Sequence, residues 1–380
     1  MKPPDRFDFV EAGPADEPEI RRLVGGTPMP GSVAIRFERE PDYFLGCSIM
    51  GDPCDVLIAR HLPDGELAGM LCRAERPAFV NGRETRIGYI GQIRAAPRFE
   101  GRWLLQRGLP LFRRRSPPGM LYFGVMAREN PRARGAFLGP RRAGGFGATR
   151  LAGWTTHALV LRAADGPPPP RWRRGSGAGA AGLTVGHGSL DTIEEIVDFL
   201  RRVGARRQLY PAYRVDDFVG GARTRGLALG DLLVARRAGS IVGVVGMWDQ
   251  SAFKQDMVAS LGPALGRIAP AYDLGARLLG ARPLPRPGQM IRAGFAALVA
   301  VDADDPGVLQ ALLREARALA WDRGLTYLTI GLADRDPLLR AMRRSLAITY
   351  RSDLFVLSWD AGGLAGRLDA RIPYIEIATL

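Results

Sequence analysis

Lysine, cysteine and histidine are all scarce in this sequence of 380 residues. Only two of its 53 basic residues are lysines, Lys2 and Lys254. With 48 glycines and 29 prolines, this arginine bias indicates a GC-rich genome before it indicates a nucleic-acid partner. The three cysteines, Cys47, Cys54 and Cys72, contain no C-x-x-C pair and support neither a disulfide framework nor a zinc site. With only three scattered histidines, we expect no metal chemistry.

Long apolar runs are also missing. No stretch approaches about 18 consecutive apolar residues, so we expect no membrane-spanning helix and no membrane partner. The first residues, MKPPDRFDFVEAG, carry acids and prolines where a secretory signal would need an apolar segment. Together with the few cysteines, these features predict a cytoplasmic protein.

A proline- and glycine-rich stretch divides the chain. The run GPPPPRWRRGSGAGAAG (166–182) continues neither a helix nor a strand, so we predict an interdomain linker over residues 165–182. It separates a first half, residues 1–164, from a second half, residues 183–380. Each half is long enough to bury its own hydrophobic core, and at roughly 100–200 residues per domain the length agrees with two domains.

The two halves repeat one pattern of elements. The repeated elements, first half before second, are hairpins at 56–71 and 232–245, strands at 88–96 and 294–302, helices at 102–112 and 307–321, strands at 121–126 and 327–332, and closing strands at 155–162 and 352–359. Hairpins combined with a helical crossover predict an α/β fold with a mixed sheet, in which parallel strands flank the middle helix.

Two segments of the first half carry a more specific pattern. The first, IRAAPRFEGRWLLQRG (93–108), is a strand followed by a proline and a basic, glycine-containing turn into a helix. The second, ENPRARGAFLGPRRAGGF (129–146), spaces Asn130, Ala133 and Gly145-Phe146 along a later segment. Both resemble the GNAT superfamily of acyl-CoA-dependent N-acyltransferases. The resemblance implies two GNAT-like domains in tandem, an internal pseudo-dimer, and acetyl-CoA or another acyl-CoA as co-substrate.

The resemblance places the cofactor at the turn before the helix. A helix N-terminus presents N–H groups and a partial positive charge that suit a pyrophosphate. The family's turn follows the outline R-x-x-G-x-G, whereas this chain has Glu100 where a basic residue is usual and Trp103 and Leu105 where small ones are usual. Trp103 would crowd the phosphates unless its ring packs into the core. The residues expected around the cofactor are Ile93, Arg94, Ala95, Arg98, Phe99, Glu100, Gly101, Arg102, Trp103, Leu104, Asn130 and Phe137.

The corresponding turn of the second half is acidic. It reads DADDPGVLQ (302–310), and acids there stabilise a helix through its dipole but repel a diphosphate. Asp305 is the expected N-cap, with Pro306 at the first helical position. We therefore predict that the second half is a non-catalytic copy. Between Arg94 and Arg150 of the first half, in contrast, thirteen arginines face two acids, a surplus of +11 that indicates an anion-binding surface.

Acyl transfer from a thioester to an amine needs a base, stabilisation of the oxyanion and protonation of the thiolate. In the family a tyrosine often serves as the general acid. The resemblance matches this tyrosine with Phe137, so the usual general acid is absent. We predict Glu84 as the base and Tyr89 or Tyr122 as the proton donor, with main-chain N–H groups at 93–95 polarising the carbonyl. The simpler alternatives are a solvated turn carboxylate for Glu84 and half-buried strand aromatics for the two tyrosines.

Two further stretches contribute predictions. FEREPDYF (37–44) lies where the resemblance places the acceptor, so that Glu38, Glu40 and Asp42 either receive a cationic amine or line a surface helix. In MWDQSAFKQ (247–255), which follows the second hairpin, Trp248, Asp249 and Lys254 are expected to make a contact between the halves.

Three functions stay open at this stage. The first is an N-acetyltransferase or related N-acyltransferase that acts on a small-molecule or peptide amine. The second is a non-catalytic binding or scaffold protein that keeps the fold. The third is an aminoacyl-tRNA-dependent acyltransferase whose arginine surplus binds phosphate.

Overall fold

The computed structural model describes residues 6–130, 135, 146–166, 182–343, 345–360 and 363–380. Its centre is a 12-stranded mixed sheet with the order β1-β3-β4-β5-β6-β14-β7-β13-β12-β10-β9-β8, and β2 and β11 form a second, two-stranded sheet. The strands are β1 (Phe7–Glu11), β2 (Val33–Glu38), β3 (Cys54–His61), β4 (Leu67–Val80), β5 (Arg83–Ala95), β6 (Tyr122–Ala127), β7 (Gly147–Val160), β8 (Leu183–His187), β9 (Leu232–Arg237), β10 (Ser240–Trp248), β11 (Gln255–Leu261), β12 (Ala293–Val301), β13 (Tyr327–Ala333) and β14 (Ala347–Ser358). The α-helices are α1 (Glu17–Gly26), α2 (Tyr43–Cys47), α3 (Leu104–Arg115), α5 (Ile193–Gly204), α6 (Val215–Phe218), α7 (Pro263–Leu278) and α8 (Pro306–Asp322).

The predicted α/β class and its repeated elements are confirmed. The strand pairs β3–β4 and β9–β10 are antiparallel hairpins. The strands on either side of α3 pair in parallel through Gly88 and Tyr122, and those on either side of α8 pair in parallel through Ala293 and Tyr327. A parallel pair needs a crossover connection, which each helix supplies.

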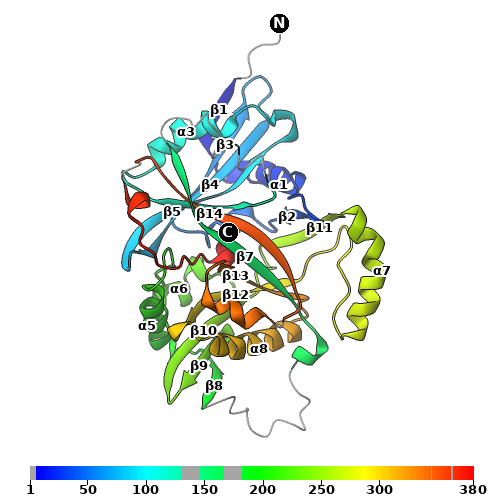
Figure 1. Ribbon diagram of the computed structural model, residues 1–380. Coiled ribbons are helices and arrows are strands. Elements are labelled where there is room, and N and C mark those ends of the chain that lie inside the picture. Colours follow the sequence, from blue (N-terminus) through cyan, green and yellow to red (C-terminus); the bar gives the residue numbers. More distant parts are fainter. Residues whose placement is uncertain (1–5, 131–134, 136–145, 167–181, 344, 361–362) are drawn as a thin grey trace.

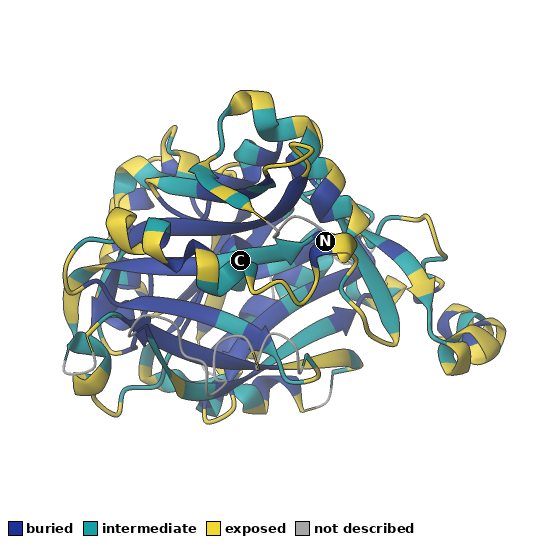
Figure 2. Ribbon diagram, turned by 90° about the horizontal axis from the view of Figure 1, so that it is seen from above, coloured by how far each residue is buried: buried dark blue, intermediate teal, exposed yellow. Residues whose placement is uncertain are grey.

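Helical periodicity explains how the helices pack. In α8, Leu309, Leu312, Leu313 and Ala316 recur at helical spacing, are all buried, and lie against β9, β10 and β12. Figure 2 shows the result: the strands of the central sheet are largely buried, and the exposed residues gather on loops and on the outer helices. None of the described helices is long and apolar enough to cross a membrane.

The closing strands of the two halves are exchanged. The first half's β7 pairs with β13 of the second half, and the second half's β14 pairs with β6 of the first (Figure 1). Between them, β7 and β14 pair with each other along their whole length. Residues 1–164 and 183–380 therefore share one continuous sheet, and residues 167–181 of the predicted linker lie outside the described part of the chain.

A second contact joins the halves beside the central sheet. Strand β11 pairs with β2, so that Gln255 lies opposite Glu38. The Gln255 side chain also donates to the carbonyl oxygen of Glu40. Of the residues predicted to join the halves, Lys254 packs beside Gly46 of the first half, whereas Trp248 donates to the Arg225 carbonyl oxygen within the second half.

Candidate functional site

The central strand of the first half bends at Gln92. Strands β5 and β6 pair only near Gly88 and Tyr89, after which β5 continues to Ala95 away from β6. Gln92 has a φ of 52°, and the register with β4 shifts there. Because a bulge of this kind turns the strand and interrupts its ladder, it opens a gap between two parallel strands. The aligned position of the second half, Leu298, has a φ of 57°, so the duplication extends to backbone conformation.

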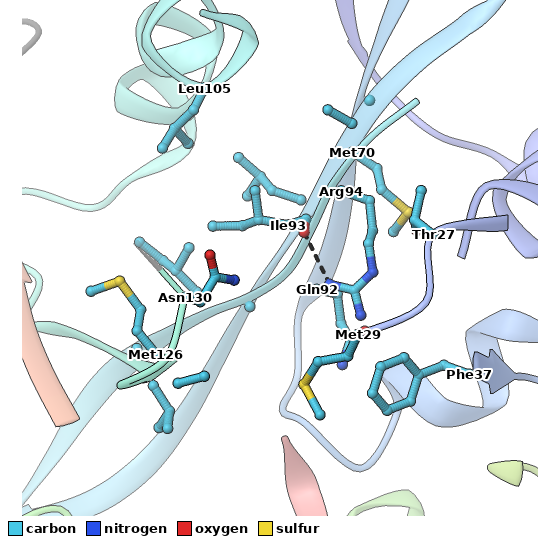
Figure 3. A pocket seen from close by; sticks show the side chains of 18 of the residues that line it. Thr27, Met29, Phe37, Met70, Gln92, Ile93, Arg94, Leu105, Met126 and Asn130 are labelled. Carbon is cyan, nitrogen blue, oxygen red and sulfur yellow. Dashed lines mark hydrogen bonds between the residues drawn. The ribbon is translucent and has the colours of Figure 1, made fainter. Parts of the chain in front are cut away.

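A cavity of about 1640 Å³ lies at this gap. Ile93 and Leu105 lie toward its α3 side, and Met29 and Phe37 lie across the strand from them (Figure 3). Its volume exceeds the roughly 300–1,000 Å³ of ordinary ligand pockets, and its lining is mostly apolar with a few charged groups. The cavity therefore has room for both an extended donor and an acceptor.

The start of α3 forms one end of the cavity. Gly101 and Trp103 have φ values of 77° and 58°, and Trp103 is the N-cap without any side-chain hydrogen bond to the helix. The Trp103 side chain is 50% exposed and lines the cavity, so its ring does not turn into the core, which was the condition for leaving the phosphate position uncrowded. The left-handed turn keeps the indole out of the core, and the helix begins at the cavity.

Comparisons with solved structures identify the architecture. A glucosamine N-acetyltransferase region of a fungal multi-domain β-N-acetylglucosaminidase matches with a TM-score of 0.59, 15% identity and 94% of this chain, which spans 38% of that protein. A GCN5-related N-acetyltransferase from Sphaerobacter thermophilus matches over 99% of both chains with a TM-score of 0.54 and 16% identity. The N-myristoyltransferase of Saccharomyces cerevisiae with bound myristoyl-CoA covers 97% of this chain and 89% of its own, with a TM-score of 0.59 and 10% identity.

The chain has the GNAT fold. No family model matches it, and no curated protein matches its sequence. The structural likeness extends over nearly the whole chain, although the motifs in its sequence are degenerate.

The GNAT fold brings most of the expected cofactor residues to the cavity. Those that line it are Ile93, Arg94, Ala95, Phe99, Glu100, Gly101, Arg102, Trp103, Leu104 and Asn130. Arg98 does not line it, because its guanidinium group pairs with Asp64 and Glu66 on the surface. Phe137 lies outside the described residues.

The three predicted catalytic residues are not brought together. Glu84 forms ion pairs with Arg201 at 2.7 Å and Arg214 at 2.9 Å, which hold the pKa of Glu84 below its usual range, and it does not line the cavity. Tyr122 is fully buried, and its hydroxyl accepts a hydrogen bond from Arg73 away from the cavity. The roles predicted for Glu84 and Tyr122 therefore have no support in the geometry.

Tyr89 does line the cavity, and its hydroxyl packs under the bulge. A Cβ at Gly91 would lie 1.9 Å from the Tyr89 hydroxyl oxygen, so only glycine fits there. Burial raises the pKa of Tyr89, which keeps the hydroxyl protonated at neutral pH. Tyr89 remains a predicted proton donor.

Lys254 lines the same cavity and was not predicted as a site residue. Its Nζ lies 3.0 Å from each of the main-chain oxygens of Ala378 and Leu380. Burial, and then the positive charge of Arg39, lowers the pKa of Lys254 to about 7. The sequence contained one signal at this position: Lys254 is one of only two lysines in a chain whose other basic residues are arginines.

The acids expected around an acceptor are used elsewhere in the fold. Glu38 pairs with Arg36, Glu40 pairs with Arg21, and Asp42 caps α2 through the Phe44 N–H. Three side chains expected to receive a cationic amine thus act in surface pairs and a helix cap.

Many arginines of the predicted anion-binding surface are also neutralised within the fold. Arg115 pairs with Glu11, and Arg128 and Arg150 both pair with Asp353. The surplus counted along the sequence therefore overstates the positive charge that faces a ligand. Arg132, Arg134, Arg141 and Arg142 lie outside the described residues.

In the second half, side chains of the protein fill the equivalent positions. Asp305 caps α8 by accepting from the Gly307 N–H at 2.8 Å, as predicted, with Pro306 following it. At the bulge, the Leu298 N–H donates to Glu376 at 2.7 Å and the Val299 N–H donates to the Tyr374 hydroxyl at 3.1 Å. The helix start and the bulge, which both line the cavity in the first half, thus bind side chains of the protein in the second half.

Proposed function

We propose that this protein is an N-acyltransferase that moves an acyl group from acetyl-CoA or another acyl-CoA to a primary amine, with its site in the first half. One observation carries the proposal: a single cavity runs from the start of α3 to the bulge at Gln92. The second half has the same bulge, but Asp305 and Glu376 fill its two ends. We infer that the second half is a non-catalytic copy that completes the shared sheet.

The donor would extend along the cavity. Its pyrophosphate would lie at the first turn of α3, where the helix supplies N–H groups and partial positive charge and Arg102 lines the wall. Its thioester carbonyl would lie near Gln92 and Ile93, whose main-chain N–H groups are candidate oxyanion donors. The matched protein from Saccharomyces cerevisiae was solved with myristoyl-CoA, which makes a long acyl chain one of the donors to test.

Lys254 is our candidate for the base. A neutral lysine amine has two N–H groups and one lone pair, and the oxygens of Ala378 and Leu380 can accept both N–H groups. The lone pair is then left to take a proton from the acceptor ammonium. The freed amine attacks the thioester carbonyl, the new C–N bond forms as the C–S bond breaks, and the thiolate takes the proton held by Lys254, or one from Tyr89 that solvent replaces. The second proton of the attacking nitrogen then passes to neutral Lys254 and on to solvent, which leaves the neutral amide.

Isothermal titration with CoA, acetyl-CoA and myristoyl-CoA tests the donor site. We expect binding by the wild-type protein, and a loss of about 10-fold or more in affinity for Arg102→Glu, which reverses a charge beside the expected phosphates. Arg114→Glu is the matched control, because Arg114 is exposed on the same helix and does not line the cavity. Absence of binding to all three compounds, or equal losses in both variants, would contradict the proposal and favour a non-catalytic protein.

A further inference from the structure

Three cationic side chains from separate parts of the chain gather on the acceptor side of the cavity. They are Arg39, Arg94 and Lys254, and all three line it. The guanidinium carbons of Arg39 and Arg94 lie 5.4 and 5.3 Å from the centroid of the Phe37 ring, so both arginines pack on one aromatic side chain (Figure 3 shows Arg94 and Phe37). The Lys254 and Arg39 side chains also pack beside the same glycine, Gly46. A Cβ built on Gly46 would lie 3.6 Å from the Lys254 side chain and 3.7 Å from the Arg39 side chain.

The negative charge near this cluster is unevenly distributed: Asp256 and Glu376 face Lys254, whereas Arg94 has no carboxylate partner among the described residues. Arg94 donates to the carbonyl oxygen of Ile93 at 3.0 Å, its Nε is buried without a partner, and it forms no ion pair with a described carboxylate. The ionisable groups that face it besides Arg39 are Tyr43, Tyr89 and Cys72. Arg39 is only 4% exposed, and its one carboxylate partner, Asp256, is 3.9 Å away.

This arrangement is costly without a counter-ion. Burying a cation is unfavourable unless it is paired and hydrogen-bonded, and like charges increase the cost. Burial and the charge of Arg39 both lower the pKa of Arg94, because both disfavour its charged form. Stacking on Phe37 offsets part of it. An anion in the cavity would supply the missing partner, and the planar guanidinium group suits an oxygen anion best.

We propose that the acceptor is an amine that also carries an anionic oxygen group, a carboxylate or a phosphate, which Arg94 and Arg39 bind beside the acyl-transfer site. The inference deepens the proposed acyltransferase function and rests on it. It excludes simple cationic polyamines as good acceptors, because the cluster would repel their second charge. Anion and amine would then bind at separate groups: the anion at the two arginines, and the amine near Lys254.

Matched acceptor pairs test the proposal. One pair compares an amino acid with its carboxamide, and the other compares O-phosphoethanolamine with ethanolamine. The reaction is followed by thiol release from the acyl-CoA that binds in the titration. We expect the anionic member of one pair to have a kcat/KM about 10- to 100-fold higher, the range of a charge-assisted hydrogen-bond pair. The pair that shows the preference distinguishes carboxylate from phosphate. Arg94→Gln should remove this preference because it raises KM for the anionic member far more than for the neutral member, and Arg94→Lys should restore part of it.

The outcomes separate this proposal from the proposed function. If no CoA compound binds, the acyltransferase proposal fails first. If the donor binds and the neutral members react as well as the anionic ones, or if no anionic acceptor reacts, the acceptor proposal is wrong. A second readout needs no turnover: acetate or phosphate should raise the melting temperature of the wild-type protein and of Arg114→Gln, but not of Arg39→Gln/Arg94→Gln. Equal shifts in all three proteins would overturn the site.

Discussion

Replacing Lys254 by methionine gives a sharp test of the proposed base. With a pKa of about 7, half of the Lys254 amines are neutral at neutral pH. A lysine with the ordinary pKa near 10.4 would be only about 0.04% neutral there, so the buried environment provides roughly a 1,000-fold larger population of base. Because general base catalysis contributes about 10²- to 10⁴-fold, we expect Lys254→Met to lower kcat/KM by that factor.

The assay is the pH dependence of kcat/KM, followed by thiol release from about pH 6 to about pH 10. The kcat/KM of the wild-type protein should rise with pH around pH 7, because Lys254 acts as a base only when its amine is neutral. The profile is measured with two acceptors whose amines differ in pKa. A limb that stays near pH 7 with both acceptors belongs to the protein and not to deprotonation of the substrate. Lys254→Arg should be as inactive as Lys254→Met, because arginine keeps the charge and the donors but stays protonated.

Two results would refute the role of Lys254 as a base. One is a limb that follows the pKa of the acceptor, and the other is substantial activity in Lys254→Arg. A stability measurement tests the lowered pKa separately. Between about pH 7 and pH 10 the unfolded chain binds more protons at Lys254 than the folded chain. The free energy of unfolding of the wild-type protein should therefore rise with pH relative to Lys254→Met, and parallel curves would show an ordinary lysine.

Two further predictions concern residues outside the proposed site. Asp305→Ala removes the cap of α8 and should lower the free energy of unfolding by about 1 kcal/mol in urea titrations, with acyl-CoA affinity unchanged because the second half holds no donor. Altered affinity would place a ligand in that half. Glu84→Gln should keep kcat/KM within about 2-fold and cost at most about 1 kcal/mol of stability above the usual glutamate pKa, a difference that disappears as the pH falls below about 4. A large loss of kcat/KM would restore Glu84 as the base.

Local patterns were sufficient to predict the elements that the two halves repeat, but not β2, β11 or α7. Apolar alternation and turn residues located both hairpins, and helical spacing located α8 with its Asp305 cap. The exchange of β7 and β14 was not predictable, because either closing strand has the apolar faces to pair in either half. Which strands β7 and β14 pair with is determined by the tertiary structure and not by the local sequence.

The site was predictable where it depends on the main chain. The turn before α3 and the strand at 93–95 line the cavity as expected, because a bulge and a helix start need few particular side chains. The charged groups were harder to predict. Glu84 was chosen for its position before an expected strand and Glu40 for its place in the resemblance, yet both form ion pairs with arginines from other elements. Lys254 reaches the first half's cavity from the second half, a proximity that only the tertiary structure shows.

The central claim is that the first half alone binds the donor. The most direct test is a crystal structure of the protein with acetyl-CoA, or with whichever acyl-CoA binds most tightly in the titrations. The account predicts density for the pyrophosphate at the start of α3, the thioester beside Gln92, and no donor at Asp305. A donor bound at the α8 turn, or an empty first-half cavity closed by the Trp103 ring, would contradict it.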